Sequence, residues 1–483
     1  MFRFKHVLIR DVAYSTVPKG ERSRLHDRYG RWLEESLGDR SIEVGEIVAY
    51  HAQQAYRFAH ELDAPNAQLL GQRALDLLFA AAWNALDRDD AAALDLYERA
   101  NAVATAIGAT PAELAEAKGY VVVLRRQIAA EQRPVDELDD AIAVARAAGP
   151  SRVLVDLLIP RAFEAHRFGL SGMPFAAEAL TVARATGDPE LVAEAMWTQL
   201  EVVYLDGDLT EMERLLAESL AYVKATGARR ARDRIYIWGS RLARYRGDLS
   251  QAAVYRDESV AVSTGSKANR GIAAFGDCRF ALAIGDVPAA VALGREALAL
   301  MREVGLPHFI GLCCLTLGDA LLAAGDAAAA RELLVEGLDI FVRRRQRRQI
   351  PELAARAARA SVRLGDIGQA RTHAEMARAT ALATDVESRY IAAVALAEVC
   401  EAEGDPAAAD AGFREALAIL GPTGIMDAQA FVHETYAEFL LRQSRGADAR
   451  GELEAARKFH YDALAFRNRA RIDALIERSQ VGA

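Results

Sequence analysis

The chain has 483 residues, of which 52% are hydrophobic, 7% aromatic and 26% charged, and its formal net charge is −9. This length allows about three domains, each with its own core. The negative net charge argues against a protein whose overall electrostatic field attracts nucleic acid or an anionic membrane, although a local basic patch is still possible. Ala, Leu, Glu and Arg prevail and favour helices, because they lose little side-chain freedom in one.

The opening MFRFKH places charges where a signal peptide would have an apolar run. No stretch reaches the roughly 18 uncharged apolar residues that a transmembrane helix needs. The four cysteines show neither a CxxC pair nor metal-ligand spacing, and each lies in an apolar helical context. We therefore expect a cytoplasmic protein with reduced, buried thiols.

The first sixty residues differ from the rest of the chain. FRFK (2–5) alternates like a β-strand, and a helix to about Val17 follows it. A Pro-Lys-Gly turn at 18–20 separates that helix from a second one, and a third is predicted over 44–62. The apolar residues of the second helix recur at helical spacing: Leu25, Tyr29, Trp32 and Leu33.

This segment resembles the end of the winged-helix domain of STAND signalling ATPases. Phe4-Lys5-His6-Val7-Leu8, followed by Arg10-Asp11, matches a family motif in which Met and Asp stand where this chain has Lys5 and Val7. The motif's His contacts the β-phosphate of bound ADP, so the resemblance implies that His6 is a nucleotide sensor. The rest of the ATP site would lie in a module upstream. LIRDVAY, ERSRLHDRYGRWLEE and AYHAQQA particularly resemble actinobacterial regulators that join a class III cyclase, an ATPase and tetratricopeptide repeats.

A Gly-Asp pair recurs at intervals of 38 to 40 residues later in the chain. Glycine can take the left-handed conformation that ends a helix, and the following Asp can accept from the free N–H groups of the next helix. Each pair therefore predicts a corner between two helices. The six pairs are Gly207-Asp208, Gly247-Asp248, Gly285-Asp286, Gly325-Asp326, Gly365-Asp366 and Gly404-Asp405.

Small residues stand at two fixed distances after these glycines, seven residues apart and hence on one helical face. Such residues let the second helix of each hairpin approach its neighbours closely. The fifth position holds Met212, Ala252, Ala290, Ala330, Ala370 and Ala409. The twelfth holds Ser219, Ser259, Ala297, Gly337, Ala377 and Ala416.

Weaker turns extend the same cycle in both directions, which predicts about ten helical hairpins between roughly residues 67 and 478. GDVPAAVALGREALALMREVG (285–305) and GDPAAADAGFREALAIL (404–420) resemble the second helix of tetratricopeptide repeats. The predicted fold is thus all-α: a winged-helix remnant over residues 1–62, then an α-solenoid of repeats of about 40 residues over 63–483.

A solenoid of this kind offers a concave surface that binds proteins, peptides or small effectors. Two features are candidates for partner binding. The basic cluster RRRQRR comprises Arg343, Arg344, Arg345, Arg347 and Arg348, and its alternative role is a solvated helix end. The aromatic pairs, whose alternative role is packing between repeats, are Trp197 with Tyr204 and Trp238 with Tyr245.

The sequence contains no phosphate-binding GxxxxGK[ST], HExxH or GxSxG motif, and its nine histidines are scattered. We therefore predict no catalytic residues, no metal and no cofactor. The leading hypothesis is a non-enzymatic sensor or scaffold that relays the state of a bound protein or effector to an ATPase or cyclase partner. The first alternative is a DNA-associated transcriptional regulator that uses the winged-helix remnant and two arginine clusters, ARRARDR (228–234) and RRRQRR (343–348). The second is a fragment of a class III adenylate or guanylate cyclase protein.

Overall fold

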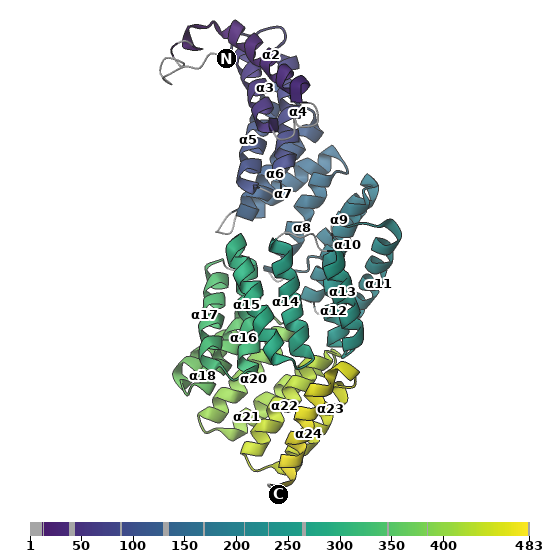
Figure 1. Ribbon diagram of the computed structural model, residues 1–483, viewed down its shortest axis with the longest axis vertical. Coiled ribbons are helices and arrows are strands. Elements are labelled where there is room, and N and C mark those ends of the chain that lie inside the picture. The colour runs from purple at the N-terminus through teal and green to yellow at the C-terminus, as the bar shows by residue number, and fades with distance from the viewer. Residues whose placement is uncertain are drawn as a thin grey trace. The chain divides into compact units, whose positions relative to one another are not determined.

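The computed structural model describes residues 12, 14–37, 44–86, 89–128, 135–167, 170–206, 208–229, 231–262, 267–344, 347–383 and 385–481. These residues form helices joined by short turns and contain no strand, which confirms the predicted all-α class (Figure 1). The predicted strand over 2–5 and His6 lie outside the described residues. No helix in the described ranges has the length and apolar character needed to cross a bilayer.

The chain divides into two compact units. Unit 1 comprises residues 1–161 and 181–187, and unit 2 comprises 162–180 and 188–483. The helices before α10 are α2 (Lys19–Leu37), α3 (Gly45–His60), α4 (Ala67–Ala85), α5 (Asp90–Ile107), α6 (Pro111–Ile128), α7 (Val135–Ala148), α8 (Arg152–Arg167) and α9 (Met173–Thr186).

The remaining helices all belong to unit 2 and can be followed from teal to yellow in Figure 1. They are α10 (Pro189–Asp206), α11 (Leu209–Thr226), α12 (Arg232–Tyr245), α13 (Leu249–Val262), α14 (Lys267–Ala283), α15 (Val287–Val304), α16 (Pro307–Ala323), α17 (Ala327–Arg343), α18 (Gln349–Arg363), α19 (Ile367–Thr380), α20 (Val386–Ala402), α21 (Pro406–Leu420), α22 (Met426–Arg442), α23 (Gly446–Phe459), the 3₁₀ turn η2 (Ala463–Ala465) and α24 (Phe466–Val481).

From α4 to α23 the helices follow one another as ten consecutive pairs, in agreement with the predicted number of hairpins. Even-numbered helices are the first of each hairpin and odd-numbered helices the second. In unit 2, each first helix from α10 to α22 packs against the second helix that follows it. First helices also contact the first helix of the next hairpin, as α16 contacts α18 and α18 contacts α20. The described chain is therefore an array of tetratricopeptide-like helical hairpins.

The Gly-Asp corners have the predicted geometry. The five glycines within the described residues have φ between 73° and 84°. In each of the six pairs, the Asp carboxylate accepts a hydrogen bond from the backbone N–H three residues on, at 2.9 to 3.3 Å. The two residues thus end one helix and cap the next, and the corner is specified locally.

Replacing Asp405 with alanine should lower the free energy of unfolding by about 1 kcal/mol, because the N–H of Ala408 loses its acceptor at 3.0 Å. Asp405→Asn should retain nearly all of the stability, since asparagine caps a helix equally well. Urea denaturation of the two variants measures the difference. Equal losses in both variants would mean that the carboxylate's charge, rather than the cap, is what matters.

The predicted columns of small residues are buried. All six residues at the fifth position are fully inaccessible to solvent, and the five side-chain-bearing residues at the twelfth position are at most 7% exposed. A Cβ atom added at Gly337 would lie 2.9 Å from the Cβ of Cys314, which shows how closely α17 approaches α16 there. Small residues at these positions therefore set the spacing of the helices.

In unit 1, α2 and α3 pack as a further pair, and the Ser23 hydroxyl donates to the buried carbonyl of Ala55 at 2.8 Å. The second and third helices predicted for this segment are thus confirmed. Its winged-helix character stays a prediction. Three of the four cysteines, Cys278, Cys313 and Cys314, are buried free thiols whose pKa burial raises to about 12.

Candidate functional site

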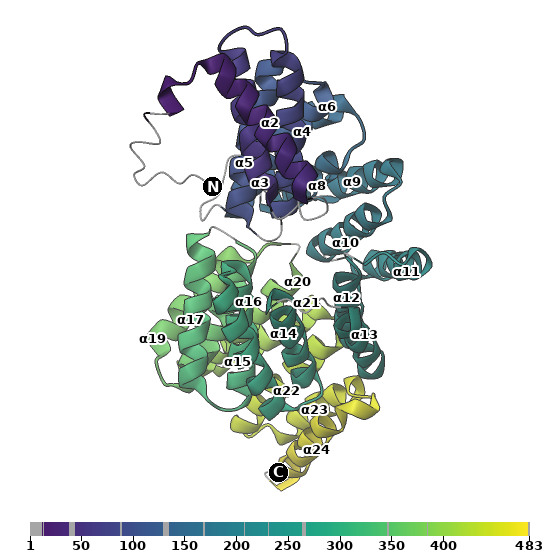
Figure 2. The ribbon, with the colours of Figure 1, turned by 45° about the horizontal axis from the view of Figure 1, so that its top comes forward.

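Unit 2 closes on itself, because its last helices return to α12, α13 and α14. Helix α12 contacts α22, and α13 contacts η2 (Figure 2). Asp462 accepts from the backbone N–H of Ser250 at 2.9 Å. Tyr461 donates to the carbonyl of Arg246 at 2.9 Å, and Asn468 donates to that of Ala283 at 2.8 Å. First helices from distant parts of the sequence therefore face one another inside this unit.

The carboxylate of Glu387, at the start of α20, joins α20 to the earlier first helices α10 and α12. It accepts hydrogen bonds from the hydroxyls of Tyr204 on α10 and Tyr245 on α12, and from Nη2 of Arg241 at 3.1 Å. The side chains of Arg241 and Glu387 are only 19% and 14% exposed. Charged hydrogen bonds in such a setting are stronger than those at the surface. We call Tyr204, Arg241, Tyr245 and Glu387, with the residues that contact them, the central cluster.

Cationic and aromatic groups alternate around Tyr204. The guanidinium carbon of Arg241 lies 4.1 Å from the centre of its ring, and that of Arg348 lies 4.5 Å from it. The ring of Trp238 is 4.8 Å away, and its indole N–H donates to Glu201 at 2.9 Å. These contacts add cation–π attraction to the hydrogen bonds.

Further ion pairs extend the cluster along the first helices. Arg244 on α12 binds Asp427 on α22 at 2.6 Å, which gives α12 a second link to the later helices of unit 2. Neighbouring hairpins are joined at 2.7 Å by two more pairs, Arg356 with Asp319 and Arg359 with Glu398. Arg348 lies 3.9 Å from Asp385. Each of these arginines therefore has an acidic partner on a different element.

Two carboxyls of the cluster have pKa values shifted in opposite directions. Burial alone would raise the pKa of Glu387, but Arg241, Arg279 and the two tyrosine hydroxyls hold it well below its usual value. Burial and the charge of Glu387 raise the pKa of Glu352 to about 7, although Arg356 and Arg348 oppose the rise. Glu387 is thus a permanent anion near neutral pH, and Glu352 titrates there.

The raised pKa of Glu352 predicts a pH-dependent contribution to stability. The carboxyl has a pKa of 4.5 without these neighbours and about 7 in the fold, so between these values the folded chain holds a proton that the unfolded chain has lost. Its contribution is therefore full below pH 4.5 and is lost as pH rises through 7. Glu352→Gln mimics the protonated form, so its melting temperature should rise relative to the wild type between pH 5 and 8. A constant difference over that range would contradict the assignment.

Four of the residues singled out in the sequence meet in the central cluster: Tyr204, Trp238, Tyr245 and Arg348. Trp197 lies elsewhere, with the Arg234 guanidinium 4.2 Å from its ring centre and Phe163 6.0 Å away. Trp238 and Tyr245 are at most 4% exposed, which favours the packing role over direct partner contact. A partner-binding role for these aromatics stays a prediction.

The basic cluster does not form one surface. Arg348 turns inward to Tyr204, whereas Arg343, at the end of α17, and Arg347 are exposed. Arg344 is half-buried, and Arg345 lies outside the described residues. Among the described arginines of this segment, only Arg348 thus contributes to the central cluster.

Sequence reasoning missed Glu387, Arg241 and Asp427. Each is a charged residue on a first helix, which is an ordinary exposed position when one hairpin is considered alone. Glu387 lies 142 to 183 residues from Tyr204, Arg241 and Tyr245, and Asp427 lies 183 residues from Arg244, beyond the reach of any local spacing rule.

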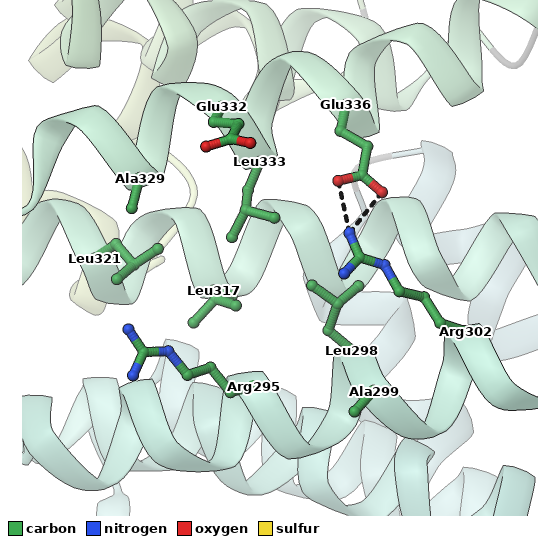
Figure 3. A pocket seen from close by; sticks show the side chains of 10 residues that line it. All are labelled: Arg295, Leu298, Ala299, Arg302, Leu317, Leu321, Ala329, Glu332, Leu333 and Glu336. Atoms are coloured by element: carbon green, nitrogen blue, oxygen red, sulfur yellow. Dashed lines mark hydrogen bonds and ion pairs between the residues drawn. The ribbon is translucent and has the colours of Figure 1, made fainter.

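A second candidate site is a groove between the second helices α15 and α17, above α16 (Figure 3). It has a volume of about 330 Å³. Leu298, Leu317 and Leu333 are among its apolar lining residues, and Arg302 spans it to reach both oxygens of Glu336 at 2.7 Å. A similar groove of about 520 Å³ lies one hairpin earlier, among α13, α14 and α15. Each groove is lined by four charged residues and several apolar ones from neighbouring helices, whereas the central cluster joins helices that are far apart in the sequence.

The sequence matches no protein-family model and no curated protein. Among solved structures, it is similar to the hetero-tetramer Cut9–Hcn1 of the APC/C at 11% identity, with 97% of this chain and 98% of that chain covered and a TM-score of 0.46. A STAND protein with a tetratricopeptide repeat sensor from Pyrococcus horikoshii is 14% identical over 93% of this chain and 68% of that chain, with a TM-score of 0.45. A Rap protein complexed with Competence and Sporulation Factor is 13% identical over 72% of this chain and 100% of that chain, with a TM-score of 0.44.

Proposed function

We propose that the chain is a non-catalytic sensor scaffold of a signalling regulator, and that the first helices of unit 2 bind a protein or a small effector. The observation that supports this most is the central cluster, where Glu387 links α20 to α10 and α12. Ion pairs between elements so far apart in sequence hold unit 2 closed. A ligand that competes for the same groups would favour a more open form.

Such a sensor works only if the ligand distinguishes two states. A ligand shifts an equilibrium by no more than the difference between its affinities for the two forms. A buried charged hydrogen bond is suited to this role, because it is either made or broken and its partners are left unpaired when it breaks. A change at the central cluster would then alter the relative positions of α12, α20 and α22.

The partner that reads this change would be an ATPase or cyclase module, as the resemblance of residues 2–60 to STAND regulators implies. The DNA-associated alternative requires a continuous basic face. The described arginines of the 343–348 segment instead divide between the interior and the surface. The scaffold role is therefore the better supported of the two.

A ligand screen on the purified full chain tests the proposal. Metabolites and synthetic peptides that raise the melting temperature are mapped by hydrogen exchange. We expect changes in protection on α10, α12, α20 and α22, which carry the central cluster. Ligands whose protection maps only to α15 and α17 would instead identify the groove of Figure 3 as the binding site and overturn the proposal.

A further inference from the structure

One inward arginine of unit 2 differs from the others. Arg279, on α14, makes no hydrogen bond or ion pair with any residue that the structure describes. Its guanidinium carbon instead lies 5.8 Å from the ring centre of Phe275, one helical turn earlier on the same helix. The other inward arginines each have an acidic partner within 4 Å: Arg241, Arg244, Arg348, Arg356 and Arg359.

The acidic groups close to Arg279 are already engaged. Glu387 accepts from Arg241 and two tyrosines, and Asp427 accepts from Arg244. Asp277, two residues before Arg279, pairs with Arg256 at 3.6 Å, and both residues line the groove among α13, α14 and α15. Burial lowers the pKa of Arg279, and the charges of Arg241 and Arg244 lower it further, whereas Tyr245 and Glu387 oppose the decrease.

An unpaired guanidinium in a partly buried position costs stability. The weak attraction to Phe275 offsets only a small part of this cost. Each of the five paired arginines has its own acidic partner, whereas Arg279 has none within ion-pair distance in the described part of the chain. A carboxylate carries the single negative charge that pairs with one guanidinium.

We infer that Arg279 is the anchor for a carboxylate of the ligand, which binds on the inner surface beside the central cluster. The chemistry next to it supports this class, since Arg241 and the two tyrosines already hold the carboxylate of Glu387. The ligand would be a small carboxylic acid or a peptide with an acidic group. The inference rests on the proposed function, because it names the ligand class of the same surface.

Titration of the full chain with glutarate and with an end-capped acidic peptide tests the inference. The titrant that binds more tightly shows whether the carboxylate comes from a small acid or from a peptide. Neutral glutaramide and inorganic phosphate are the controls. We expect Arg279→Gln to weaken carboxylate binding by about tenfold or more, and Arg279→Lys to bind with intermediate affinity. Because Arg279 makes no ion pair with the described residues and only its longer-range attraction to Glu387 would be lost, Arg279→Gln should melt much less far below the wild type than Arg241→Gln does.

Three results would overturn the inference. They are no binding of either carboxylate, equal carboxylate affinity in the wild type, Arg279→Gln and Arg279→Lys, or a higher affinity for phosphate than for both carboxylates. A melting temperature of Arg279→Gln lowered as far as that of Arg241→Gln would also do so, since Arg279 would then be structural. A neutral ligand that changes the protection of α12 and α20 would refute the carboxylate anchor and leave the proposed function intact.

Discussion

Replacing Glu387 with glutamine is expected to lower the free energy of unfolding of unit 2 by about 3–5 kcal/mol at neutral pH. The substitution keeps the size of the side chain but removes the charge that Arg241 and two tyrosine hydroxyls bind. It therefore leaves a guanidinium that is only 19% exposed without its anion. Removing one partner of such a pair costs more free energy than the intact pair contributes to stability, because the remaining charge stays desolvated.

The loss should depend on pH. The pKa of Glu387 is held below its ordinary value of 4.5, so its contribution is present above pH 4.5 and disappears as pH falls through the folded value. Chemical denaturation from pH 7 downward should thus show the wild type approaching the variant. Glu454→Gln is the matched control, since Glu454 and Arg450 form an exposed pair within α23 and their separation should cost at most about 0.5 kcal/mol. Equal losses in the two variants would show that the central cluster contributes no more than a surface pair.

The second large effect is expected from Ala370→Leu, which should lower the free energy of unfolding by about 1–3 kcal/mol. Ala370 is fully buried in the first turns of α19, at a position that keeps hairpins close together. Three additional carbon atoms there must displace neighbouring side chains or backbone.

Gly368→Ala is the control for Ala370→Leu. It lies in the same helix, and a Cβ atom added there meets nothing within 4 Å. That substitution should leave stability unchanged or raise it slightly, because alanine favours helix over glycine. If Ala370→Leu proved as stable as Gly368→Ala in urea, the small residues would reflect composition rather than packing.

The hairpins were predictable because their signals are local. At each corner, glycine and aspartate act within the same few residues, as Gly325 and Asp326 do between α16 and α17. The small residues repeat in phase with the corners, so burial of Ala330 and Gly337 followed from spacing alone. Regular repeats bury the same face in each hairpin, and the periodicity of the sequence therefore predicts most of the fold.

The central cluster was only partly predictable. The spacing of Tyr204, Trp238 and Tyr245, large aromatic residues on first helices, predicted that they share a face. Their acid partner Glu387 lies on α20, and only the closure of unit 2 brings it to them. Arg348 shows the same limit, because the sequence placed it in a run of arginines and the turn before α18 directs it inward. Long-range closure depends on small rotations summed over many hairpins, which no single segment records.

We propose that the cluster around Glu387 holds α12 and α20 together in the closed form of unit 2. Spin labels can be placed at Glu258 on α13 and Glu415 on α21, two exposed positions on the helices that pair with α12 and α20. The distance between the two labels, measured by pulsed electron paramagnetic resonance, would report the separation of the two hairpins. The wild type and Glu454→Gln should each give one narrow distance distribution, and Glu387→Gln should give a broader and longer one. An unchanged distribution in Glu387→Gln would show that the cluster does not hold these helices together.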